Sequence, residues 1–279
     1  MYKDVNNYLF SVELSAAIFL NSNVNHKLTN KIYFEILNIK KCDNLVKQNE
    51  LNLFIDGGFN LINYPEAKVL FRFPNFAFRP SQSDILHIDL FIENNNFLPD
   101  SGSYSYTENS LDQLYDLSES FGHNTVSFDN LSQMKKYSKF LYINWPKYNF
   151  LHKNKFKKQY LYFGSGYTHF NGAVHNRIVK LKKNELIVID LLKGIRKHAD
   201  LNWRINLEDL SYTVKNNKLV FESKENLNQK MEFFINNKEY SINLIDGFVS
   251  KKYSEKSKIK ILNIKLTARN VRAKSTFKW

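Results

Sequence analysis

Two hydrophobic periodicities divide the chain near residue 50. Before that point, apolar residues recur at a spacing closer to 3.6 than to 2, from Leu9 to Leu20 and again from Ile32 to Ile39. This spacing predicts two helices, joined by the Asn-rich turn at residues 21–25. Two helices of this length can bury their apolar faces only against another structure. Residues 1–50 are therefore interpreted as packing for the following domain, or as the end of a larger helical domain.

From residue 51 to residue 279, apolar and polar residues alternate in short runs that are bounded by turn residues, which is typical of strands. Many such runs without helical patterns between them favour a mainly β domain. The predicted fold is a set of stacked antiparallel sheets, a β-sandwich or supersandwich, preceded by two or three helices. The clearest runs are Lys68–Phe73, Ile85–Ile92, Asn124–Phe128, Gln159–Phe163, Asn176–Leu181, Glu185–Asp190, Lys218–Phe221 and Ile259–Leu266.

Composition excludes several classes of protein. Hydrophobic residues at 43% and charged residues at 24% are ordinary globular values, which argues against a disordered chain. The single cysteine, Cys42, excludes an internal disulfide framework and a cysteine-rich zinc site. No apolar run reaches the roughly 18 residues of a membrane span. The N-terminus lacks the basic region of a signal peptide, so the sequence as written predicts a cytoplasmic protein.

The net charge of +13 is unevenly distributed along the chain. Residues 84–129 carry nine acids and no Lys or Arg, whereas residues 130–184 carry twelve Lys or Arg and no acid. The basic stretch has two interpretations: lysines that protect a solvated strand edge, or a positive surface for an acidic polysaccharide. Nucleic acid is a disfavoured partner, because no recognised nucleic-acid-binding pattern accompanies the charge.

Five motifs follow one another in the first part of the predicted β domain. They are Gly57-Gly-Phe59, Arg79-Pro-Ser-Gln-Ser-Asp84-Ile-Leu-His87-Ile-Asp89, Asp100-Ser-Gly-Ser-Tyr104-Ser-Tyr106, His123-Asn-Thr-Val126 and Gly172-Ala-Val-His175-Asn-Arg177. In this order they resemble the C-terminal β-domain of the heparinase II/III family of polysaccharide lyases, over about residues 57–192.

The resemblance implies a toroid of α-hairpins followed by stacked antiparallel sheets. This chain has room only for the sheets, and residues 1–50 would match the last helices of the toroid. The implied chemistry is β-elimination at an acidic sugar, with a Tyr and an Asn or His from the helical domain and a His from the β-domain. The implied partners are an acidic polysaccharide, such as a glycosaminoglycan, and a separate helical-domain chain. Family members are often periplasmic or secreted.

The same resemblance assigns the catalytic and metal positions. Gln82 stands where the family has a histidine, and an amide can hydrogen-bond but cannot transfer protons. His123 is the leading catalytic candidate, with a role in fixing the strand entry as the alternative. The one cofactor that the resemblance suggests is a divalent metal such as zinc. The residues at the positions of the family's metal ligands are Gln82, Asp100 and His123. Two good ligands and one amide make a poor zinc site, and Asp100 also suits an Asx turn.

Residues expected to contact the substrate are Arg79, Tyr104, Tyr106 and His175, although Arg79 could instead pair with Asp84 and the tyrosines could simply pack. His87 alternates with apolar neighbours, which favours a hydrogen-bonded core residue or one that faces a partner. The predicted function is the β-domain of a polysaccharide lyase that is weak or inactive alone. A non-catalytic carbohydrate-binding or structural subunit is the alternative, and whether the chain is an enzyme stays open.

Overall fold

Antiparallel strands make up most of the part of the chain that the structure, a computed structural model, describes. The described residues are 50–279, apart from 65, 77, 93–94, 106–115, 139–140, 207–209, 216–217, 224–229 and 237–238. The helices predicted before residue 50, and Tyr106, lie outside them. No helix in this described part is long and apolar enough to cross a membrane.

The described strands form four sheets. The first has five strands in chain order, β1 (Leu51–Phe54), β2 (Phe59–Asn63), β3 (Ala67–Arg72), β4 (Ile88–Ile92) and β5 (Asn95–Leu98). A four-stranded sheet has the order β17 (Tyr240–Lys252), β18 (Glu255–Leu266), β13 (Ala199–Ile205) and β6 (Val126–Phe128). The short 3-10 helix η1 (Ser120–Gly122) precedes β6, and β7 (Lys135–Ser138) pairs with β8 (Leu141–Ile143).

The largest sheet has eight described strands and forms the base of the domain. Its order is β14 (Leu210–Lys215), β15 (Lys218–Ser223), β16 (Lys230–Ile235), β19 (Asn270–Lys278), β12 (Glu185–Lys193), β11 (Val174–Lys182), β10 (Tyr160–Thr168) and β9 (Tyr148–Lys157).

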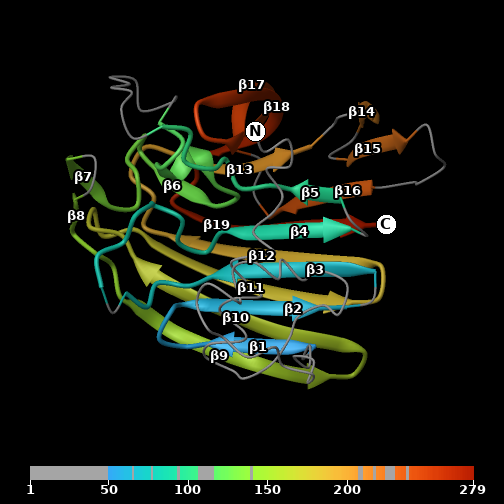
Figure 1. Ribbon diagram of the computed structural model, residues 1–279, viewed down its shortest axis with the longest axis horizontal. Helices are drawn as coiled ribbons and strands as arrows, with labels where there is room; N and C mark the ends of the chain where they lie inside the picture. Colours follow the sequence, from blue (N-terminus) through green and yellow to red (C-terminus); the bar gives the residue numbers. More distant parts are fainter. Residues whose placement is uncertain are drawn as a thin grey trace, which may run out of the picture. The chain divides into compact units, whose positions relative to one another are not determined.

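The five-stranded sheet and the four-stranded sheet, called here the two smaller sheets, pack on one face of the eight-stranded sheet (Figure 1). This arrangement confirms the predicted stacked antiparallel sheets. The five-stranded sheet lies over β9 and β10, with the ring centroids of Phe71 and Phe163 5.4 Å apart. The four-stranded sheet lies over β19, where the Trp203 and Phe277 centroids are 4.9 Å apart. One aromatic core is therefore shared by all three sheets.

The alternation that predicted the strands is visible as two faces of the eight-stranded sheet. In β11, the buried residues Arg177, Val179 and Leu181 alternate with the half-buried Ile178 and Lys180. Successive side chains of a strand point to opposite faces. The first set therefore faces the core, and the second set faces away from the two smaller sheets.

Truncation of Phe163, which fills the layer between β10 and β3, is expected to lower the free energy of unfolding by about 3–5 kcal/mol, because Phe163→Ala leaves a cavity between two sheets. Phe156→Ala, on the neighbouring strand, removes a ring that is 57% exposed and should cost less than about 0.5 kcal/mol. Urea unfolding of both variants measures the difference. Equal losses would mean that the stacked layer is not the core of the domain.

Candidate functional site

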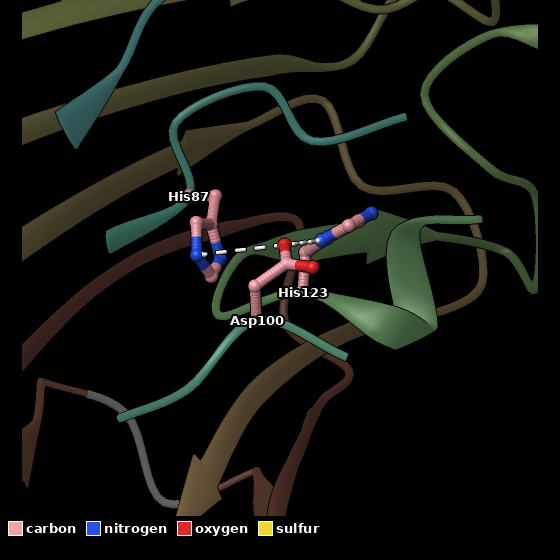
Figure 2. A group of neighbouring side chains, drawn as sticks. All are labelled: His87, Asp100 and His123. Atoms are coloured by element: carbon pink, nitrogen blue, oxygen red, sulfur yellow. Dashed lines mark hydrogen bonds and ion pairs between the residues drawn. The ribbon is translucent and has the colours of Figure 1, made fainter. Parts of the chain in front are cut away.

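Three motif residues meet where the two smaller sheets adjoin. His87 directly precedes β4, Asp100 follows β5, and His123 lies between η1 and β6. Each offers a ligand atom, and these atoms all lie within 4.8 Å of one another. Figure 2 shows both imidazole rings turned toward the Asp100 carboxylate, with His123 Nδ1 at 2.7 Å and His87 Nε2 at 3.7 Å from Oδ2. We call this group the His–Asp–His cluster.

The Asn124 amide holds together the segments that carry the cluster. Its Nδ2 donates to the carbonyl oxygens of Ile88 and Leu98, each at 3.0 Å, and its Oδ1 accepts the backbone N–H of Arg204 at 2.6 Å. The backbone N–H of Asn124 also donates to Nδ1 of His87 at 2.9 Å. One buried side chain therefore fixes β4, the end of β5 and β13 around the two histidines.

Arg177, buried on the inner face of β11, binds the same segments from the side of the eight-stranded sheet. Its Nη1 donates to the carbonyl oxygens of Leu86 and Asn124, both at 2.6 Å, while Asp190 accepts bonds from Nε and Nη2. Leu86 has a φ of 60°, in the left-handed region that a leucine rarely adopts. Its carbonyl is bound by Arg177 and its N–H by the carbonyl of Arg72, so the surrounding contacts hold this strained conformation in place.

Asp100 forms the predicted Asx turn, and its carboxylate also faces the two histidines. Its Oδ1 accepts the N–H of Gly102 at 2.7 Å, which is the expected Asx turn, and its Oδ2 faces the two histidines. Gly102 has a φ of +76°, and a Cβ there would come within 2.2 Å of the Ser250 carbonyl oxygen. The turn therefore requires glycine at position 102. The turn in its place directs the Asp100 carboxylate toward the two histidines.

The pKa values of Asp100 and His123 shift in opposite directions within the cluster. Burial alone would raise the pKa of Asp100, but His123, His87 and the Gly102 N–H hold that pKa well below its usual range. Burial acts to lower the pKa of His123, and the Asp100 carboxylate outweighs it, so the pKa of His123 is raised. Both shifts act in the direction that favours an imidazolium–carboxylate pair between His123 and Asp100.

Accessibility differs among the three residues. His123 is fully buried and His87 is 4% exposed, whereas the Asp100 side chain is 29% exposed. A buried imidazole cannot touch a polymer at the surface. In this arrangement His123 acts on Asp100, and direct proton transfer from His123 to a substrate would need a movement of the loops.

The third member of the cluster is His87, in the place that we assigned to Gln82. Gln82 donates a hydrogen bond from its Nε2 to the Ser103 hydroxyl at 3.1 Å, beside the Asp100 turn. The sequence pattern concealed His87, because its apolar neighbours indicated a core residue. It is indeed buried and hydrogen-bonded, but its Nε2 faces Asp100 and lies 3.6 Å from Asp89. The His87-x-Asp89 spacing was the available signal.

The predicted substrate contacts fall in different places. Arg79 is exposed, and Asp84 pairs with Arg72 at 3.3 Å in place of the alternative partner Arg79. Tyr104 is half-buried with its ring 3.8 Å from the Lys256 ammonium.

His175 is separate from these surface residues. Its ring is fully buried and its Nε2 lies 2.7 Å from Asp190, so in this arrangement it stabilises the core beside the Arg177–Asp190 pair. Burial lowers the pKa of His175, so the ring is neutral at pH 7.

The His–Asp–His cluster fits a divalent cation. Two imidazoles and a carboxylate are ligands that zinc prefers, and the buried Nε2 of His87 has no hydrogen-bond partner among the residues that the structure describes. Because Asn124 donates to Nδ1 of His87, a neutral His87 carries its proton on Nε2. Metal binding through Nε2 would therefore move the His87 proton to Nδ1 and break the hydrogen bond from Asn124, and it would release the Nδ1 proton of His123.

Comparisons with known proteins identify the family and the fold. The sequence matches the family described as heparinase II/III-like, C-terminal, over residues 47–279. A solved heparinase III is 15% identical with a TM-score of 0.72, covering 98% of this chain and 41% of its own. Heparan sulfate lyase HepC from Pedobacter heparinus is 17% identical with a TM-score of 0.72, covering 99% of this chain and 42% of its own.

These structural likenesses concern the fold. The chain spans about two fifths of the length of the solved structures that it matches. No curated protein matches the sequence.

Zinc is expected to bind at one site per chain with release of protons, and more weakly as the pH falls. His87→Ala, Asp100→Asn and His123→Ala should each lower zinc affinity by about tenfold or more. His152→Ala, at an exposed histidine, and Gln82→Ala should leave it unchanged. Isothermal calorimetry in two buffers of different ionisation enthalpy measures both affinity and proton release. Loss of affinity in Gln82→Ala but not in His87→Ala would restore the original ligand assignment.

Proposed function

Because the chain belongs to the heparinase II/III-like C-terminal family, we propose that its β-domain supplies one half of the active site of a polysaccharide lyase. The other half would come from a helical domain. The observation that carries the proposal is the convergence of three motifs, 79–89, 100–104 and 123–126, on the His–Asp–His cluster.

The proposed reaction is β-elimination at an acidic sugar. A base takes the proton on the carbon α to the uronate carboxylate, the electron pair forms a carbon–carbon double bond, and the glycosidic oxygen leaves with a proton from an acid. Charge develops on the uronate carboxylate during proton removal. A group that neutralises this carboxylate therefore stabilises the transition state.

Polar residues in the loops that carry Gln82 and Asp100 suit recognition of the substrate. Arg79 lies three residues before Gln82 in the same loop, and its exposed guanidinium can pair with a carboxylate through two parallel hydrogen bonds. The linked Gln82 and Ser103 side chains can bond sugar hydroxyls. A divalent cation at the cluster would add positive charge and join the three segments. The family resemblance implies a Tyr and an Asn or His from the helical domain and a His from the β-domain. Because His123 is buried in the described arrangement, we assign base and acid to the helical domain.

A non-catalytic carbohydrate-binding or structural subunit is the second candidate. The burial of His87 and His123 favours it, because neither ring in the described cluster is open to a substrate. The two candidates differ in one result, which is whether elimination appears when the helical domain is supplied.

The purified chain alone is expected to show no elimination on heparan sulfate, hyaluronan, alginate or bacterial capsule polymers. Ultraviolet absorbance of the unsaturated uronate measures the reaction directly. Addition of a helical-domain polypeptide encoded beside this chain should produce activity. Arg79→Ala should then lower kcat/KM by about tenfold or more, through loss of a charge-assisted pair. Arg196→Ala, at an exposed arginine outside the loop, is the matched control.

Two outcomes would count against this proposal. Strong elimination by the chain alone would show that the β-domain holds a complete active site. Inactivity of the assembled pair on every acidic polymer would favour the binding subunit.

A further inference from the structure

The eight-stranded sheet carries a basic groove on the face opposite to the two smaller sheets. The groove has a volume of about 640 Å³. Its lining includes five cations and an aromatic ring, from Lys153, Lys155, Lys157, Lys180, Arg272 and Tyr162. The cations come from three strands that are far apart in sequence, β9, β11 and β19.

Strand register explains why these cations share one surface. Lys155 of β9 pairs with Tyr162 of β10, which pairs with Lys180 of β11. Neighbouring strands lie about 4.8 Å apart, so this row crosses roughly 10 Å of the sheet. Lys157 lies two residues along β9 and therefore on the same face. The basic run of the sequence becomes a two-dimensional array on this face.

The groove has no internal charge compensation. None of its lining residues is acidic, and no ion pair joins Lys153, Lys155 or Lys157 to a carboxylate within the described part of the chain. The nearby Glu185 already contacts Lys182 at 3.2 Å and the Tyr160 hydroxyl at 2.7 Å. An array of like charges in a concave surface concentrates anions there. This argues against a purely protective strand edge, which needs lysines at the edge but no groove.

The floor of the groove is apolar. Ile178, Ile189 and Leu191 line it together with Tyr162, whose ring lies 5.2 Å from the Lys180 ammonium. A sugar ring offers C–H faces to such a floor and directs its acidic substituents toward the surrounding cations. Single-stranded nucleic acid requires a series of open aromatic rings for its bases, and among the described lining residues only the exposed His152 and the half-buried Tyr162, which lies beneath Lys180, have aromatic rings that are not buried.

The groove is separate from the candidate site. Arg177, which supports the His–Asp–His cluster, faces the core from β11, whereas Ile178 and Lys180 of the same strand face the groove. The two features therefore occupy opposite faces of one sheet. We propose that the basic groove binds a linear polysaccharide bearing carboxylate or sulfate groups, as a second surface in addition to the proposed lyase site.

The test compares two triple variants of the full chain with the same change in charge. One carries Lys153→Glu, Lys155→Glu and Lys157→Glu in the groove. The other carries Lys135→Glu, Lys147→Glu and Lys197→Glu at exposed lysines outside it. Heparan sulfate binding is measured by calorimetry at low and high salt. The groove variant should bind about 30-fold more weakly with a flatter salt dependence, and the control should change less than about threefold.

The outcomes separate this proposal from the lyase proposal. Equal loss in both triple variants would show a non-specific charge effect and would overturn the groove. Equal affinity for neutral dextran, or stronger affinity for single-stranded DNA, would overturn the polysaccharide assignment. The groove variant should still support elimination of short oligosaccharides with the helical domain added. A loss of heparan sulfate binding in Arg79→Ala but not in the groove variant would place binding at the cluster alone.

Discussion

The buried pair of Arg177 and Asp190 is the interaction on which the candidate site depends. Both side chains are fully buried, and Arg177 holds the pKa of Asp190 below its usual range against the opposing effect of burial. Removing one partner of such a pair commonly costs about 3–5 kcal/mol, because the other charge is left uncompensated. The pair lies on the middle strands of the largest sheet, where no movement of the backbone could easily expose it to water.

The remaining donors of Arg177 bind the backbone of the segments that carry the two histidines. They reach the carbonyl oxygens of Leu86 and Asn124, which directly precede His87 and directly follow His123. The strained conformation of Leu86 and the backbone N–H of Asn124 then set the direction of the His87 ring, and Asp100 binds the ring of His123. The Asx turn at Asp100 brings in the carboxylate. The eight-stranded sheet, which hydrophobic packing stabilises, thus also positions three polar side chains from separate loops.

Sequence patterns predicted the fold better than the site. Strict alternation in runs such as Asn176–Leu181 follows from burial on one face, so the sandwich was predictable. The order of the motifs also identified Asp100 and His123 as neighbours. His87 was predicted as a hydrogen-bonded core residue or one that faces a partner, and it is buried and hydrogen-bonded, but its place in the cluster was not predicted because the pattern of its neighbours in the sequence does not show it. The roles of Arg177 and Asn124 were not predictable, since their partners include backbone carbonyls 25 to 91 residues away. Likewise, only strand register could show that Lys155 and Lys180 share one face.

The affinity of Arg177→Lys for zinc is the measurement that tests this account most directly. A lysine can keep the charge beside Asp190 but cannot also bind two carbonyl oxygens. Phe163→Ala is the matched control, because it destabilises the same core without touching the segments of His87 or His123. At a temperature where both variants are folded, we expect Arg177→Lys to bind zinc about tenfold more weakly than the native chain, and Phe163→Ala to bind it normally. Native affinity in Arg177→Lys would contradict the account and would leave Arg177 with a role in core stability alone.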